Sequence, residues 1–344
     1  MEGNGSGAAS TSFLGGTQSP VVVVIGADGN LYGVDYGQSL FELTAPESRN
    51  GVWEYRLLNA LNGTTEGEGI QGITLDAKGN IYGATENGGD MSICQQQGCG
   101  TVFELKRPAK NGGKWSFSML YAFTGSSTGE EPFAGVTLDQ KGNLCGTTHS
   151  GGTYGYGVTY RLTPPAKKGQ PWNETVLYSF DRIDNEGNSP AATVTFDSAG
   201  NIYGTTISGG DPNCQAGIGC GVVYELSPPA KKGKGWTYTT LYAFQGGSDD
   251  GAVPSGPIVF DSSGNLYGTT EAGGQTNGGT AYRVSPPGSG GTWTETVLYA
   301  FPGIDGTNPI VPEGLTWGKW NDLYGVTMGG GLCQGCGTAF EIRP

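Results

Sequence analysis

The stretch GNLYGTTEAGG, Gly264–Gly274, occurs in six related copies along this chain of 344 residues. The other copies are GNLYGVDYG from Gly29, GNIYGATENGG from Gly79, GNLCGTTHSGG from Gly142, GNIYGTTISGG from Gly200 and NDLYGVTMGGG from Asn321. A motif that returns about every 58 residues indicates a repeat protein, in which each copy is one structural unit packed against its neighbours.

Each unit predicts four β-strands, as the copy around Ile202 illustrates. Its strands are expected in ATVTFD, NIYGTT, GVVYELSPP and GWTYTTLYAF. Strict alternation would place one set of side chains on one face of the fourth strand: Trp236, Tyr238, Thr240, Tyr242 and Phe244.

The turn between the first two strands reads Asp-x-x-Gly-Asn, as in Asp261 to Asn265. Glycine takes a positive φ at no steric cost, and the aspartate can cap the turn. A calcium loop is the alternative, but it needs several oxygen ligands in series, and only one aspartate recurs. The pattern therefore favours a structural turn.

Four strands per unit and six units predict an all-β fold, a six-bladed β-propeller. The blades are expected over about 20–61, 70–123, 134–180, 192–244, 256–301 and 313–344. The last unit stops after its third strand, while TSFLGG near the N-terminus resembles the end of a fourth strand. We expect Ser10 to Leu14 to pair with the final blade and close the ring, which would remove open sheet edges.

A second period doubles the first. Ile81 and Ile202 lie 121 residues apart, and so do Ile202 and Leu323. Blades two, four and six carry glutamate in the third strand, whereas blades three and five carry arginine; these residues are Glu104, Glu225, Glu341, Arg161 and Arg283. A two-blade module repeated three times, with pseudo-threefold symmetry, accounts for the alternation.

Six of the seven cysteines form close pairs in those even-numbered blades: Cys94/Cys99, Cys214/Cys220 and Cys333/Cys336. The pairs lie in separate repeats, so they cannot supply four ligands to one metal ion. Three local disulfides are predicted, and with them an exported protein. Cys145 replaces the repeat tyrosine inside an apolar strand, which predicts a buried, inert thiol.

Composition excludes several classes of function. Charged residues are only 14% and the net charge is −13, which argues against a nucleic-acid partner. No apolar run approaches the length of a membrane span. The N-terminal MEGNGSGAAST has no basic and apolar leader, so we expect a mature start without a signal peptide.

The motifs LYGTTxxGG, GTVFEL and LYAF together resemble the GloVer-type (Gloeo/Verruco) tandem repeats of exported bacterial proteins. The resemblance extends over essentially the whole chain. It implies export and a propeller-like repeat, and it carries over no catalytic residue.

One position, directly after the YGTT stretch, differs between blades while its neighbours stay alike. It holds Tyr36, Glu86, His149, Ile207, Glu271 and Met328. The second strand ends there, on the face that also holds the cysteine hairpins and the acidic loops, here called the top face; the lysine-rich PPAKKG loops define a basic bottom face. Such variation is typical of a site built on a scaffold, although it also fits an exposed position without a role.

Gln71 and Glu313 stand just before the first strands of blades two and six, at the expected channel mouth. Together with Glu86, His149 and Glu271 they would surround one shallow basin. Carboxylates beside an imidazole can act as general acid and base, or hold a cation. We expect Glu86, His149 and Glu271 to be catalytic in an enzyme, with Tyr36, Gln71 and Glu313 binding ligand; Tyr154 and Tyr156, in a top loop, suit stacking on sugars.

Three functions remain open from the sequence. The first is an exported module that binds carbohydrate or another cell-surface ligand through its top loops. The alternative is an extracellular hydrolase or lyase acting on polysaccharide at the channel mouth, and the third is a matrix or filament component. No motif requires a cofactor, although calcium remains a possible one, and the oligomeric state is left open.

Overall fold

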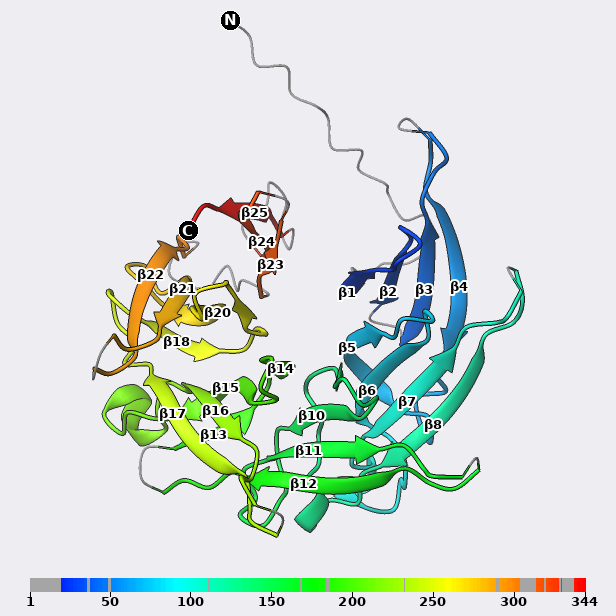
Figure 1. Ribbon diagram of the computed structural model, residues 1–344, viewed down its shortest axis with the longest axis horizontal. Helices are drawn as coiled ribbons and strands as arrows, with labels where there is room; N and C mark the ends of the chain where they lie inside the picture. The colour runs from blue at the N-terminus through cyan, green and yellow to red at the C-terminus, as the bar shows by residue number, and fades with distance from the viewer. Residues whose placement is uncertain are drawn as a thin grey trace, which may run out of the picture.

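A computed structural model of the chain describes residues 20–35, 38–48, 51–110, 112–167, 169–183, 186–231, 233–288, 291–303, 314–318, 320–327, 329 and 337–344. Six antiparallel sheets follow one another around a ring, and β1, β5, β14 and β23 lie on the side of their sheets that faces the centre (Figure 1). The predicted six-bladed β-propeller is therefore confirmed.

The strands run outward through each blade in chain order. Blades one to three contain β1 Pro20–Ile25, β2 Leu31–Asp35, β3 Ser39–Thr44, β4 Glu54–Ala60; β5 Glu68–Leu75, β6 Ile81–Asn87, β7 Thr101–Lys106, β8 Ser116–Ala122; β9 Thr137–Leu138, β10 Leu144–Thr148, β11 Val158–Thr163 and β12 Asn173–Ser179.

The other three blades follow the same order. They contain β13 Gly187–Pro190, β14 Thr195–Phe196, β15 Ile202–Gly209, β16 Val222–Ser227, β17 Thr237–Ala243; β18 Gly251–Pro254, β19 Val259–Phe260, β20 Leu266–Gly273, β21 Thr280–Ser285, β22 Thr294–Ala300; β23 Thr316–Trp317, β24 Leu323–Val326 and β25 Ala339–Ile342. Short 3-10 helices lie at Cys94–Gln96, Ser126–Thr128 and Cys214–Gly217.

The innermost strand is interrupted in blades four and five. There β13 and β14 both pair with β15, and β18 and β19 both pair with β20. Blade six has three strands among the described residues. The predicted closing strand, Ser10 to Leu14, lies outside them, so closure by the N-terminus stays a prediction.

The glycine of the repeated Tyr-Gly pair is required by the aromatic residue of the third strand. A Cβ atom on Gly204 would lie 2.5 Å from the hydroxyl of Tyr224, and one on Gly83 would lie 2.5 Å from Cζ of Phe103. The fully buried ring thus crosses directly over a residue that has no side chain. The same pairing recurs in all six blades, which explains why this glycine is constant.

The second threonine of the repeat ties two strands to the top loop. The hydroxyl of Thr85 accepts the backbone N–H of Thr101 at 3.0 Å and donates to the carbonyl of Asn87 at 2.8 Å. Equivalent bonds are made by Thr148, Thr206, Thr270 and Thr327. Each threonine is buried, so this bonded hydroxyl avoids the cost of an unsatisfied polar group.

The fourth strand does not keep the alternation predicted for it. Its pairing with the third strand shifts by one residue between Tyr224 and Val223, which leaves Leu241 as a β-bulge. As a result Trp236 and Tyr238 pack against blade three, whereas Phe244 packs against blade five. The prediction that these aromatic residues share one face was wrong, because a bulge reverses the side-chain alternation.

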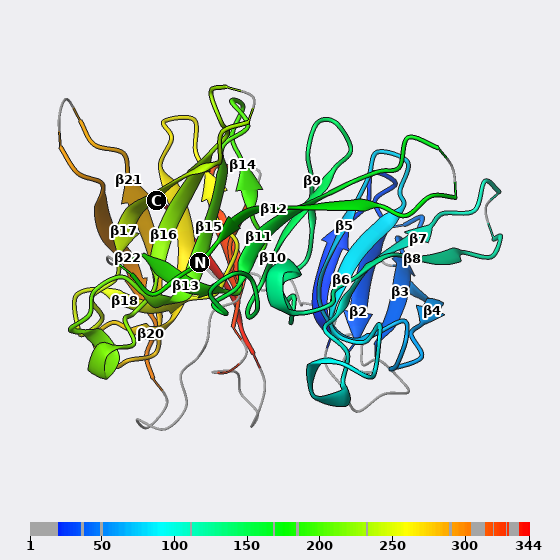
Figure 2. The ribbon, with the colours of Figure 1, turned by 90° about the horizontal axis from the view of Figure 1, so that it is seen from below.

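The apolar clusters lie between neighbouring blades rather than inside any one of them. One cluster joins blades two and three around Phe123 and Tyr160, and another joins blades four and five around Phe244 and Tyr282. The connections between strands leave the ring at two opposite faces (Figure 2). Within the described part of the chain, no helix has the length and apolar character needed to span a membrane.

Candidate functional site

Glu86 and Gln71 lie together at the top of blade two. Glu86 is near the end of β6, and Gln71 lies on the innermost strand β5 beside it. A hydrogen bond joins the two side chains, and the carboxylates of Glu68 and Glu131 are close enough to act on Glu86. The structure therefore brings two of the predicted basin residues together and adds two further carboxylates.

His149 lies in blade three, directly after β10, and meets the same group through Glu131. Its backbone N–H donates to the carbonyl of Glu131 at 2.8 Å. Its ring packs on Phe133, with ring centroids 5.0 Å apart, and its buried Nδ1 has no hydrogen-bond partner among the described residues. Glu131 is thus the residue that links Glu86 and His149.

The electrostatics of this basin favour neutral forms of both predicted catalytic groups. Burial raises the pKa of Glu86, and the charges of Glu131 and Glu68 raise it further, against the opposing hydrogen bond from Gln71. Burial lowers the pKa of His149, while the charge of Glu131 opposes that shift. Carboxyl and imidazole groups are the side chains that most often act as general acids and bases.

Glu271 does not join this group. It lies on β20 of blade five, on the opposite side of the ring from β6 (Figure 1). Tyr36 and Glu313, the remaining predicted basin residues, lie outside the described residues. Of the predicted basin, the structure assembles Glu86, Gln71 and His149.

The two top-loop tyrosines have different surroundings. Tyr154 is 54% exposed, as stacking on a ligand requires. Tyr156 is half-buried, and the guanidinium of Arg182 lies over its ring at 5.7 Å from the centroid. Tyr156 therefore already has a cation–π partner within the protein.

Comparison between blades explains that contact. The carbonyl of Tyr156 accepts the backbone N–H of Ser189, just as the carbonyls of Cys99 and Cys220 accept N–H groups from the next blade. Tyr156 thus occupies the place of the second cysteine in a blade that has no disulfide. Blade three therefore has a cation–π contact at the position where blades two and four each have a disulfide.

Two of the predicted disulfides, Cys94–Cys99 and Cys214–Cys220, are present. The third, Cys333–Cys336, lies outside the described residues. Cys145 is a buried free thiol, as predicted, and burial raises its pKa to about 12, so it is a thiol rather than a thiolate at neutral pH.

A cavity of about 370 Å³ opens on the top face of blade four. Its polar side chains come from the segment that enters the blade, Arg182, Glu186 and Asn188. The opposite wall is the cysteine hairpin, which contributes Gly209, Gly210, Pro212, Gly217, Ile218 and Gly219. Because glycine has no side chain, this wall is formed largely by peptide backbone, in which the N–H groups of Gly209, Gly210, Ile218 and Gly219 already donate to carbonyl groups of the protein.

Three residues with a strained backbone lie where each innermost strand meets the top hairpin of the preceding blade. Glu131, Ser189 and Val253 occupy one repeat position, each directly before a proline, and have φ values of 57°, 56° and 59°. A positive φ is unfavourable for residues other than glycine, most of all for a β-branched one. Each residue donates its N–H to the hairpin of the preceding blade, which holds the strained conformation in place.

The repeated bottom turns are satisfied by their own donors. Asp261 accepts the N–H groups of Ser263 and Asn265 at 2.8 and 2.9 Å, the amide of Asn265 at 2.6 Å and the hydroxyl of Tyr267 at 3.0 Å. Burial alone would raise the pKa of Asp261, but these hydrogen bonds lower it. Both carboxylate oxygens are engaged within the turn, which supports the structural interpretation over a calcium loop.

Four residues of these two sites were not predicted from the sequence: Glu131, Arg182, Glu186 and Asn188. A signal for part of this set existed, because Glu131 and Ser189 each precede the repeated proline that interrupts the inner strand. Arg182 and Glu186 lie in the segment DRIDNEG, residues 181–187, whose acidic composition by itself predicts only a solvated loop.

Comparisons with solved structures place the fold among known propellers. An oxidoreductase described as a glucose dehydrogenase from Thermus thermophilus is 16% identical, with a TM-score of 0.56, covering 96% of this chain and 98% of that one. A carbohydrate-active enzyme of family AA12 from Trichoderma reesei is 14% identical, with a TM-score of 0.54 and 90% coverage of both chains. The extracellular domain of a hybrid two-component system from B. thetaiotaomicron is 13% identical, with a TM-score of 0.51, over 89% of this chain and 32% of that one.

These likenesses show the fold, because identity is low throughout. A search among curated proteins found no match to the sequence. The family comparison is specific: the Gloeobacter/Verrucomicrobia repeat matches residues 91–340, which include most of the blades and both described disulfides. The chain therefore belongs to the Gloeobacter/Verrucomicrobia repeat family, as its tandem motifs predicted.

Proposed function

We propose that this protein is an exported propeller that binds a saccharide on its top face, in the cavity of blade four. The observation that carries the proposal is the composition of that cavity. Arg182, Glu186 and Asn188 face a wall of glycine peptide groups across about 370 Å³, within the range of small-molecule sites.

The chemistry of the two walls suits a polyhydroxylated ligand. Sugar hydroxyl groups both donate and accept hydrogen bonds, and this cavity offers the guanidinium of Arg182 and the amide of Asn188 as donors beside carboxylate and carbonyl acceptors. Ile218, which is 53% exposed, supplies apolar surface at the cavity for the C–H face of a sugar ring. Glu186 is held in position by the hydroxyl of Tyr178, which donates to it.

Export is supported by the two disulfides, since such bonds persist in oxidising compartments. Proteins of similar fold include a carbohydrate-active enzyme and the extracellular domain of a hybrid two-component system. Those names are compatible with a saccharide ligand outside the cell.

A glycan array followed by calorimetric titration tests the proposal. Arg182→Ala and Asn188→Ala should each weaken binding of the best array ligand by about tenfold, the effect of losing one well-placed hydrogen bond to a charged or buried group. Arg343→Ala, which removes an arginine that is 80% exposed in blade six, is the matched control and should leave affinity unchanged. Full affinity in both cavity variants would place the ligand elsewhere.

A second candidate is a glycan-active enzyme that uses the basin of Glu86 and His149. The observation favouring it is the shared neighbour Glu131, which acts on a carboxyl of raised pKa and an imidazole of lowered pKa. In a reducing-sugar assay, Glu86→Gln and His149→Ala should each lower turnover by about 10²–10⁴-fold. Glu271→Gln changes the same repeat position on the far side of the ring and should have no such effect; an equal loss there would contradict the assignment.

A further inference from the structure

A second cavity, of about 330 Å³, lies between blades one and two on the bottom face. One wall is formed by the outer strands of blade one, with Glu42, Tyr55 and Arg56. The other is the loop between β7 and β8, with Arg107 and Lys110. Asn30, Thr44, Glu54, Pro108, Gly112 and Trp115 complete the lining.

The repeat is broken at this cavity. Arg107 occupies a position that is alanine in blade one and proline in every other blade: Ala45, Pro164, Pro228, Pro286 and Pro344. Arg56 occupies a position that is serine or threonine in blades two to five: Ser118, Thr175, Thr239 and Thr296. Two arginines that depart from the repeat thus converge on one cavity.

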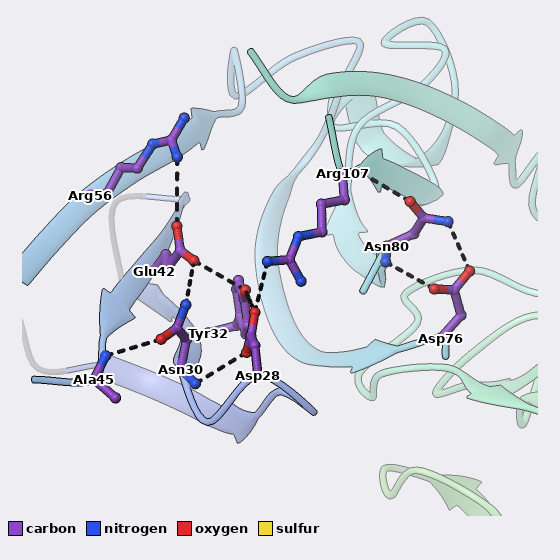
Figure 3. A network of polar contacts seen from close by, with 9 residues as sticks. All are labelled: Asp28, Asn30, Tyr32, Glu42, Ala45, Arg56, Asp76, Asn80 and Arg107. Carbon is purple, nitrogen blue, oxygen red and sulfur yellow. Dashed lines mark hydrogen bonds and ion pairs between the residues drawn. The ribbon is translucent and has the colours of Figure 1, made fainter. Parts of the chain in front are cut away.

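Both arginines are held in place by contacts that leave donors over. Arg107 reaches across the blade boundary, and its Nη2 lies 2.8 Å from Oδ2 of Asp28 (Figure 3). Arg56 donates to the carbonyl of Gly113 at 2.7 Å and lies 3.8 Å from Glu42. Since each guanidinium has five N–H groups, these contacts fix the side chains without exhausting them.

The carboxylate wall is equally fixed. Glu42 is only 6% exposed, and its Oε1 accepts hydrogen bonds from Asn30 at 2.9 Å and Tyr32 at 3.1 Å. Figure 3 shows this buried carboxylate facing Arg56 and linked to the turn that receives Arg107. The cavity therefore combines fixed cations, a fixed acceptor and, in Tyr55 at 51% exposure, an accessible aromatic ring.

We infer that this cavity is a binding site for a saccharide that bears a carboxylate. The guanidinium groups and Lys110 would receive the carboxylate, because Arg pairs with carboxylates in a planar, two-bond geometry. Glu42, Glu54 and Asn30 would accept from hydroxyl groups, and Tyr55 would cover one face of the ring. The two wall carboxylates, Glu42 and Glu54, repel a compact dianion such as phosphate more strongly than a singly charged sugar acid, which also brings several hydroxyl groups that can donate to them.

Calorimetric titration of the full chain with sodium glucuronate, glucose and inorganic phosphate at low salt tests the inference. Glucuronate should bind about tenfold more tightly than glucose. Arg107→Ala, which installs the residue of blade one, and Lys110→Ser should each weaken glucuronate binding by about tenfold. Lys167→Ser removes the corresponding lysine of blade three and is the matched control, with unchanged affinity expected.

Two results would contradict the inference. Tighter binding of phosphate than of glucuronate would overturn the saccharide assignment. An equal loss of glucuronate affinity in Lys167→Ser would show that the general positive charge of the bottom face, rather than this cavity, attracts the ligand. Lys110→Ser lies in a surface loop and keeps the test decisive should Arg107→Ala fail to fold. Asn188→Ala must leave glucuronate binding intact, which separates this site from the one proposed on the top face.

Discussion

The interface between blades three and four and the interface between blades two and three are formed by equivalent strands, but the side chains that meet there differ in chemistry. Between blades three and four, Tyr178 stacks on Tyr238 with centroids 4.9 Å apart and planes 18° from parallel. Between blades two and three, the equivalent tyrosine, Tyr121, donates its hydroxyl to Glu174 at 2.9 Å. Glu174 and Tyr238 occupy the same position of the fourth strand.

The difference shows that one position distinguishes the two kinds of blade boundary. Blade five, like blade three, has a glutamate at this position: Glu295 stands where blade four has an aromatic ring. Burial raises the pKa of Glu174 to about 7 and that of Glu295 to about 8, in the second case with help from the charge of Asp250. The carboxylate boundaries therefore titrate near neutral pH at a position where the stacked boundary carries a ring.

The largest effect should come from breaking what both boundaries share. Gly204→Val would force a side chain into the space of Tyr224, which is fully buried and stacked on Tyr238. Overpacking of this kind costs about 3 kcal/mol, which lowers the melting temperature by about 4 °C in a protein of this size.

Scanning calorimetry measures the loss, and Gly235→Val is the control. Gly235 lies in the loop before β17, and nothing lies within 4 Å of a Cβ placed there. Equal melting of the two variants would show that the glycine of the second strand is not the constraint described above.

How far the sequence alone predicts this molecule follows from the same residues. The period of the Tyr-Gly-Thr-Thr motif predicted six blades, because that motif is a packing requirement repeated in every blade. The bulge at Leu241 could not be read from the strand, since its apolar residues fit an unbroken alternation equally well. Nor could the sequence pair Arg107 with Asp28, because contacts across a blade boundary depend on how two repeats dock.

The next prediction uses pH to separate the two boundaries. A carboxyl whose pKa is raised in the folded state stabilises the fold fully below its unfolded pKa of about 4.3, and that contribution is lost as pH rises through the folded value. The free energy of unfolding should therefore fall between about pH 5 and pH 8. The expected loss is about 1–2 kcal/mol per group, below the full value of the shift because both carboxyls are partly solvated.

Glu174→Gln and Glu295→Gln should each flatten this slope, since an amide stays neutral in both states. His149, whose pKa burial lowers, gives a slope of opposite sign near its own titration. Urea titrations at each pH should therefore be compared as the difference in the free energy of unfolding between the parent protein and a variant. Tyr238→Glu should give the boundary between blades three and four the same fall in the free energy of unfolding with rising pH. A destabilisation of that variant that does not depend on pH would contradict this role of the carboxyl groups.

The smallest effect concerns the top face, where the disulfide of blade four and the cation–π contact of blade three occupy equivalent places. Cys214 and Cys220 close a loop with a sequence separation of 6, so replacing both by serine should cost only about 1–2 kcal/mol by extension of the loop-entropy relation. Arg182→Ala removes the guanidinium from Tyr156 and should cost about 0.5–1 kcal/mol, because the contact is partly solvated. Arg182→Lys keeps a cation near the ring and should recover part of the loss in calorimetry. The contrary result is that Arg182→Ala costs as much as the loss of the disulfide and that Arg182→Lys recovers nothing. In that case the packing of the arginine stem, rather than its charge, stabilises this loop. The disulfide and the cation–π contact would then share a position in the blade but not a stabilising role.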